Sequence, residues 1–134
     1  DLHSLRRRQR QMCIRDSASD PQYGHMVMFG LGGVFIEVLK DVVFRLAPLT
    51  DVDAEEMIRS VKAYKLLEGA RGTTPAQMDQ LRDCLLRISQ LVTDFPCITE
   101  LDINPLIISE KNGEGIAVDG RVKVDLKKAL AQLT

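Results

Sequence analysis

The chain has 134 residues, of which 45% are hydrophobic and 28% are charged, and its formal net charge at pH 7 is −1. This length and apolar content are enough for one hydrophobic core, so we expect one domain. The near-zero charge gives no electrostatic case for binding nucleic acid or an anionic membrane surface, and no apolar run is long enough to span a bilayer. Because the basic start is not followed by an apolar segment of signal-peptide type, we expect a soluble, cytoplasmic protein.

The N-terminal segment differs in character from the rest of the chain. Residues 1–17 carry five arginines and few core-forming side chains, and the sequence does not begin with Met. A basic arm that binds nucleic acid is one interpretation. The rest of the chain has no excess of basic residues, which favours a second interpretation, that this segment comes from a foreign or misread junction in the coding sequence. We therefore expect residues 1–18 to lie outside the domain and residues 19–134 to form it.

Three cysteines are present, at Cys13, Cys84 and Cys97. An odd number without C-x-x-C spacing indicates neither a disulfide framework nor a zinc site. Cys84 lies in a helical pattern and Cys97 lies beside an apolar run, so we expect both to serve as small buried hydrophobic residues.

The first part of the domain has a strand-rich pattern. An apolar run at 26–29 is followed by a glycine loop at 30–33, and β-rich runs then occupy 34–39 and 42–48. The loop does not open a helix, which excludes a dinucleotide-binding fingerprint. Glycines here either permit positive φ or let the backbone approach a ligand closely.

Two helices are predicted next. Residues 50–53 open the first, with acidic side chains near its positive N-terminus. A loop at 66–74 contains Arg71 between two glycines, and this arginine either holds a phosphate or carboxylate or is simply exposed. Thr74 as N-cap and Pro75 in the first turn begin the second helix, which ends near residue 94. A short helix over 125–133 closes the chain.

A hairpin lies between the second helix and the last one. Two apolar or β-branched runs, 99–108 and 116–124, are separated by a turn that contains Asn112 and Gly113. An Asn-Gly pair between such runs is the strongest short-range hairpin signal. The resulting order of strands, helices and hairpin predicts an α+β fold, a mostly antiparallel sheet with helices packed on one face.

Polar residues alternate along the first hairpin strand. Glu100, Asp102 and Asn104 would share one face, while Leu101 and Ile103 would point into the core. A polar outer face is also ordinary for a half-solvated antiparallel strand.

The hairpin register brings two oxygen-bearing side chains together. If the loop is residues 110–113, Asn104 pairs with Asp119, and a tighter turn shifts Asp119 by one pair. In either case an amide oxygen and a carboxylate come close. Such hard oxygen ligands suit Mg²⁺, which uses few protein ligands and completes its shell with water and phosphate oxygens.

Several sequence blocks together carry a resemblance to a known family. From about residue 20 to 124, the chain resembles the C-terminal part of the ATP-grasp domain of ADP-forming acyl-CoA synthetases, the acetate–CoA ligase type, related to the β subunit of succinyl-CoA synthetase. The blocks stand in the family's order at residues 20–24, 27–38, 41–49, 66–72, 100–106 and 117–119.

The resemblance implies an activity and a site. The implied reaction converts acyl-CoA, ADP and phosphate into acid, CoA and ATP through a phosphorylated histidine. By the same match Asn104 and Asp119 would hold Mg²⁺, and Asp102 would support phosphoryl transfer. The resemblance further implies that Gly32, Gly33 and Arg71 lie near the phosphates of ATP or ADP.

The resemblance also implies what lies on other segments. The first ATP-grasp lobe would precede this chain, and a CoA-binding, phosphohistidine-bearing domain or subunit would complete an oligomeric enzyme, so the chain alone is expected to be inactive. Two alternatives remain: a regulatory domain fused to a lysine acetyltransferase, and a non-catalytic scaffold for subunit contact. Neither the acyl substrate nor the preference for adenine or guanine is encoded in recognisable residues here.

Overall fold

The computed structural model describes residues 10–20, 24–32, 40–69 and 72–133. These residues form strands and helices in the order β1 (Gln11–Asp20), β2 (Gly24–Leu31), β3 (Val42–Leu46), α3 (Asp51–Ser60), α4 (Tyr64–Leu67), α5 (Met78–Asp94), β4 (Ile98–Ile108), β5 (Gly115–Ala117), β6 (Gly120–Val124) and α6 (Leu126–Leu133).

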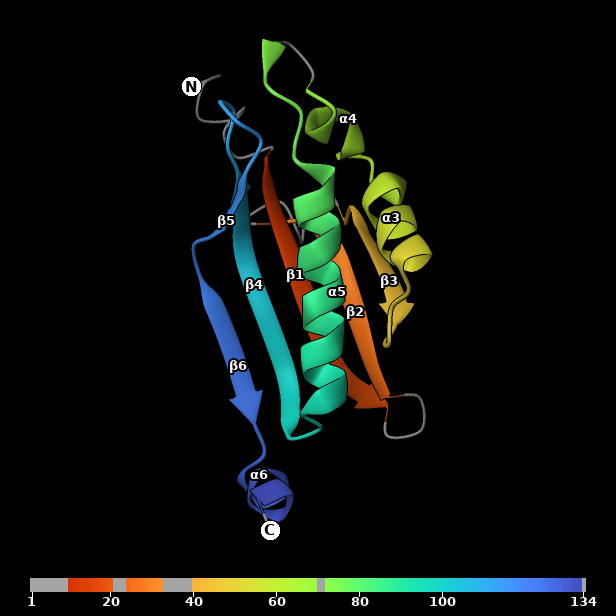
Figure 1. Cartoon of the computed structure of the whole chain (residues 1–134), viewed down its shortest axis with the longest axis vertical. Coiled ribbons are helices and arrows are strands. Elements are labelled where there is room, and N and C mark those ends of the chain that lie inside the picture. Colours follow the sequence, from red (N-terminus) through yellow and green to blue (C-terminus); the bar gives the residue numbers. More distant parts are fainter. Residues whose placement is uncertain (1–9, 21–23, 33–39, 70–71, 134) are drawn as a thin grey trace.

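The strands form one antiparallel sheet. The order across it is β3-β2-β1-β4-β5, and β6 pairs with the other half of the β4 edge. Helix α5 runs along one face of the sheet, with α3 beside it over β3, and α6 lies beyond the end of β6 (Figure 1). The predicted α+β architecture, with an antiparallel sheet and helices on one face, is confirmed.

The core lies between α5, α3 and the covered face of the sheet. Helix α5 buries Leu81, Leu85, Ile88 and Val92, which recur at helical spacing, while its charged side chains face outward. Their partners from the other elements include Met12, Ile14, Val27, Phe29, Met57, Ile58, Leu101, Leu106 and Ile108. This packing leaves the opposite face of the sheet free to carry polar side chains.

Strand β1 differs from the expectation for residues 1–18. Gln11–Asp20 is a central strand, paired with β2 on one side and β4 on the other. Met12 and Ile14 are fully buried. Because side chains alternate between the two faces of a strand, this segment supplies core residues although its composition is basic. The expected exclusion of residues 11–18 from the fold was therefore wrong, while residues 1–9 lie outside the described residues. A foreign origin for the segment stays a prediction, and the upstream coding sequence tests it.

Helix α5 begins later than predicted. It starts at Met78, and the preceding segment 73–77 is bonded to the tip of the hairpin instead. The backbone N–H of Thr74 donates to Glu110 O (3.1 Å), and that of Gln77 donates to Gly113 O (2.9 Å). The Thr74 hydroxyl donates to Lys111 O, so it does not cap the helix. Tertiary hydrogen bonds have replaced the predicted N-terminal turn.

Helix α3 begins where the sequence places it. The Thr50 hydroxyl accepts from the N–H of Asp53, and the Asp53 carboxylate accepts from the N–H of Thr50, which forms a capping box. The helix ends at Ser60, and the short helix α4 follows.

The remaining expectations on the fold have mixed outcomes. All three cysteines are free thiols; Cys97 is buried and Cys84 is half-buried. The predicted strand at 34–39 lies outside the described residues. Among the helices that the structure describes, none is long and apolar enough to cross a membrane.

Candidate functional site

The hairpin of β4 with β5 and β6 brings Asn104 next to Asp119. Leu106 pairs with Ala117 and Ile103 pairs with Gly120, so Asn104 and Asp119 are opposite each other. The backbone N–H of Asn104 donates to Asp119 O at 3.1 Å. The loop spans residues 110–113, which is the first of the two registers considered from the sequence.

The glycine segment after β2 reaches the same place. A Cβ added to Gly32 would lie 2.9 Å from Asn104 Oδ1 and 2.5 Å from Met12 O. Real Cβ atoms do not approach so closely, so only glycine fits here. Gly32 is thus required by close packing against the Met12 backbone and the Asn104 side chain, while the interpretation that the glycine loop lets the backbone approach a ligand stays a prediction.

The alternation of buried and polar side chains along β4 shifts by one residue near Asn104. Between Met12 and Ile14, β1 advances two residues while β4 advances three, from Leu106 to Ile103. This irregularity lies at Asn104-Pro105, whose peptide bond is cis. Leu101 and Leu106 can therefore both be buried although they are five positions apart, an odd number that would place them on opposite faces of a regular strand.

Asp102 lies on the face of β4 away from the helices. Its Oδ1 accepts a hydrogen bond from Arg15 Nε at 3.1 Å and lies 3.6 Å from Cys13 Sγ. Burial, followed by the Asp102 charge, raises the pKa of the Cys13 thiol to about 12, which keeps it protonated at neutral pH. Asp102 itself is about one-third exposed and accessible to a ligand.

Two other predicted site residues belong to segments that the structure does not describe. Gly33 and Arg71 lie outside the described residues, so their expected place near a phosphate stays a prediction. Sequence reasoning missed Arg121 and Lys123, which border the groove that contains Asp102. The signal that could have found them is the hairpin register, because it places Arg121 opposite Asp102.

The donor set suits a hard divalent cation that is shared with another ligand. The amide of Asn104 and the carboxylate of Asp119 are oxygen donors of the kind that Mg²⁺ accepts. Within the described ranges, no group of three or more His, Cys, Asp or Glu side chains could hold a metal ion. Because Mg²⁺ commonly uses one or two protein ligands together with water and phosphate oxygens, two donors from this hairpin fit it.

The structure is an antiparallel sheet covered by helices on one face, with the oxygen-donor hairpin at its edge. The chain matches the family model for the ATP-grasp domain over residues 3–124. The chain belongs to this family. The matched range includes most of the N-terminal segment.

Individual relatives are ligases. The chain is 49% identical over 104 residues to subunit beta of ADP-forming acetate–CoA ligase II from Pyrococcus furiosus; the match covers 77% of the chain and 44% of that subunit. It is also 49% identical over 105 residues to the ADP-forming 4-hydroxybutyrate–CoA ligase of Nitrosopumilus maritimus, covering 78% of the chain and 15% of that enzyme. The chain thus spans less than half the length of these relatives.

A solved structure has the same fold. Acetyl-coenzyme A synthetase 1 of Ca. Korarchaeum cryptofilum superimposes with a TM-score of 0.78 at 45% identity, over 86% of this chain and 53% of that one. It was solved in complex with coenzyme A and Mg-AMPPCP, with its phosphohistidine segment pointing towards the nucleotide-binding site.

Proposed function

We propose that the chain supplies the metal-binding half of the nucleotide site in an ADP-forming acyl-CoA synthetase. The complete enzyme would convert acyl-CoA, ADP and phosphate into acid, CoA and ATP through a phosphorylated histidine. The observation that carries the proposal is the pairing of Asn104 with Asp119, joined by a backbone hydrogen bond and packed beside Gly32. The chain that contains this pair is 49% identical over 104 residues to a subunit of such a ligase.

Each residue has a role that its chemistry suits. The oxygens of Asn104 and Asp119 hold Mg²⁺, which neutralises the charge of the nucleotide phosphates. Gly32 lets the backbone lie against Asn104, which fixes the amide in place. Asp102 would orient the reacting groups, and the expectation that Gly33 and Arg71 serve the phosphates comes from the sequence alone. Catalysis of this kind depends on positioning and charge neutralisation.

The acyl substrate would be selected elsewhere. One relative named for acetate and one named for 4-hydroxybutyrate have the same sequence identity to this chain, 49%. The proposed partners are therefore a CoA-binding, phosphohistidine-bearing domain or subunit and the first ATP-grasp lobe, in a cytoplasmic oligomer.

Calorimetry of Mg²⁺-dependent ADP binding tests the proposal. The protein is the chain completed with its upstream half, compared with Asn104→Ala and Asp119→Ala. We expect each variant to lose at least about tenfold in Mg²⁺-dependent affinity, because removing a ligand or its support typically costs 10–100-fold. Asp83→Ala, an exposed carboxylate on α5 at the other face of the sheet, is the control. Unchanged binding in both site variants, with the fold retained, would favour the scaffold function instead.

A further inference from the structure

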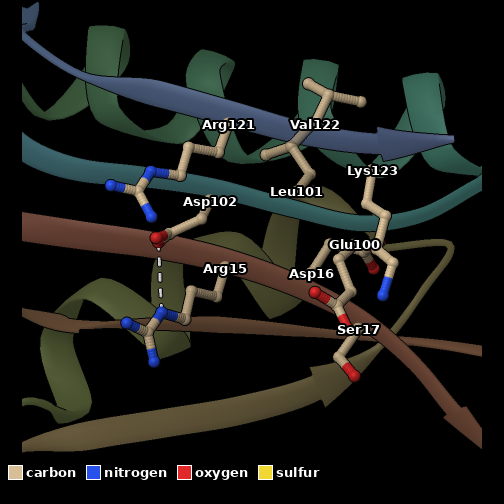
Figure 2. A pocket seen from close by; sticks show the side chains of 9 residues that line it. All are labelled: Arg15, Asp16, Ser17, Glu100, Leu101, Asp102, Arg121, Val122 and Lys123. Carbon is tan, nitrogen blue, oxygen red and sulfur yellow. Dashed lines mark hydrogen bonds and ion pairs between the residues drawn. The ribbon is translucent and has the colours of Figure 1, made fainter.

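A groove of about 480 Å³ lies on the face of the sheet opposite α5, formed by β1, β4 and β6. Its charged side chains come from all three strands, and they stand in front of the sheet with α5 behind it (Figure 2). The outward-facing polar residues are Arg15, Ser17, Glu100, Asp102, Arg121 and Lys123.

Strand register arranges these side chains in two rows. Arg15 pairs with Asp102, and Asp102 pairs with Arg121, which puts one carboxylate between two arginines. In the next row Glu100 pairs with Ser17 on one side and Lys123 on the other. Directly opposed residues share a face of the sheet, so each row is a contiguous strip of polar groups.

The charges in the groove are incompletely paired. Arg15 donates to Asp102 Oδ1 at 3.1 Å, so this arginine already has an anionic partner. Neither Arg121 nor Lys123 has a side-chain hydrogen bond or an ion pair within the part of the chain that the structure describes. Both are exposed. The groove therefore offers two cationic side chains to an incoming ligand.

Asp16 also borders the groove but does not add an outward charge. Its side chain is fully buried, and its Oδ2 lies 2.6 Å from His25 Nδ1. Burial raises the pKa of this carboxyl, and the neighbouring His25 partly offsets the effect. The outward face is thus left with three cations and two carboxylates.

The row of Arg121 is next to the predicted metal ligands. Arg121 follows Asp119 by two residues on the hairpin, and Asp102 precedes Asn104 by two. Two residues of an extended strand span about 7 Å, a distance that the long side chain of arginine can cover in reaching towards a group held at the metal ligands. The planar guanidinium of arginine is suited to bidentate contact with phosphate oxygens.

We propose that Arg121, assisted by Lys123, binds the phosphoryl group that the phosphohistidine segment brings to this groove. The assignment rests on the proposed function and adds a residue to it. In the transfer, the P–N bond to histidine breaks and its electron pair stays on the ring nitrogen, which takes up a proton. A terminal oxygen of the β-phosphate of ADP forms the new P–O bond of ATP. Arg121 compensates the charge on the equatorial oxygens throughout.

The test uses the complete enzyme, phosphorylated on histidine with labelled phosphate and then mixed with Mg-ADP. The transfer rate and the affinity for Mg-ADP are both measured for Arg121→Gln, Arg121→Lys and Lys123→Gln. The control is Arg87→Gln, an exposed arginine of α5 on the other face of the sheet. Asp119→Ala is included as the variant that tests the metal site.

We expect Arg121→Gln to slow transfer by about 10²-fold, in the range for loss of one charge-stabilising donor, with Mg-ADP affinity within about twofold of wild type. Arg121→Lys should recover part of the rate, Lys123→Gln should lose several-fold, and Arg87→Gln should match wild type. A wild-type transfer rate in Arg121→Gln would overturn the assignment, as would an equal loss of Mg-ADP binding. If Asp119→Ala keeps its Mg²⁺-dependent binding, the proposed metal site fails independently of Arg121.

Discussion

At the scale of single residues, Asp41 shows how one carboxylate holds a turn. It is buried, and its two oxygens accept hydrogen bonds from the backbone N–H groups of Lys62 and Ala63, each at 2.7 Å. These donors lie where the chain leaves α3 and enters α4, so they have no partner within a helix. Asp41 thereby ties the start of β3 to the helical layer.

We expect Asp41→Ala to lower the free energy of unfolding by about 2–3 kcal/mol, because it leaves one buried and one partly buried N–H donor without a partner. Asp125 is a matched control, since it also accepts from two backbone N–H groups, those of Lys127 and Lys128, but at an exposed helix start. Asp125→Ala should cost about 1 kcal/mol or less. Urea unfolding followed by circular dichroism gives both values. Equal losses would mean that burial adds nothing to the role of Asp41.

At the scale of elements, helices α3 and α5 are joined by a charge network around Glu55. Its carboxylate accepts from Arg59 on its own helix at 2.9 Å and from Arg82 of α5 at 3.2 Å. These hydrogen bonds, that of Arg59 first and then that of Arg82, lower the pKa of Glu55. The contacts are exposed, so salt and solvent screen them.

The lowered pKa predicts a definite pH dependence. The stabilisation is present above the pKa of an unfolded glutamate, about 4.3, and is lost as pH falls through the lower folded value. The difference in stability between wild type and Glu55→Gln should therefore favour wild type at pH 7 and shrink towards zero in acid. Urea titrations across this range measure it. A difference between wild type and Glu55→Gln that stays constant with pH would contradict the network.

At the scale of the whole molecule, the hairpin tip docks against the segment before α5. A Cβ on Gly113 would lie 2.0 Å from Pro75 O, and Gly113 has φ of +74°. Gly72 has a similar φ of +79° but open space around it. Comparing the two glycines therefore separates the cost of a positive φ, which both have, from the cost of a close tertiary contact, which only Gly113 has.

Gly72→Ala should cost about 1–2 kcal/mol, the price of a left-handed conformation for an alanine. Gly113→Ala should lose about 1–3 kcal/mol more, because the Pro75 backbone must also move away. Thermal and urea unfolding of the two variants give the comparison. Similar losses would show that the docking of the tip contributes little.

Much of the site could be predicted because its geometry is local. The Asn-Gly turn and the alternating strands bring Asn104 and Asp119 close together within one hairpin, and the structure selects the register in which the two are directly opposite. Helix α3 likewise follows from a capping box that spans only four residues. The groove around Asp102 could not be predicted in the same way, because Arg15 comes from a strand 87 residues away in the sequence.

The sequence by itself determined the types of most elements, the presence of the hairpin and the α+β class, because periodicity, caps and turns act between neighbours. The tertiary structure alone decided that Gln11–Asp20 is a central strand and that residues 73–77 bond to the hairpin tip. It also decided that Arg15 of β1 lies beside Asp102 in the groove. These outcomes depend on hydrogen bonds and packing between distant segments, for which no local pattern exists.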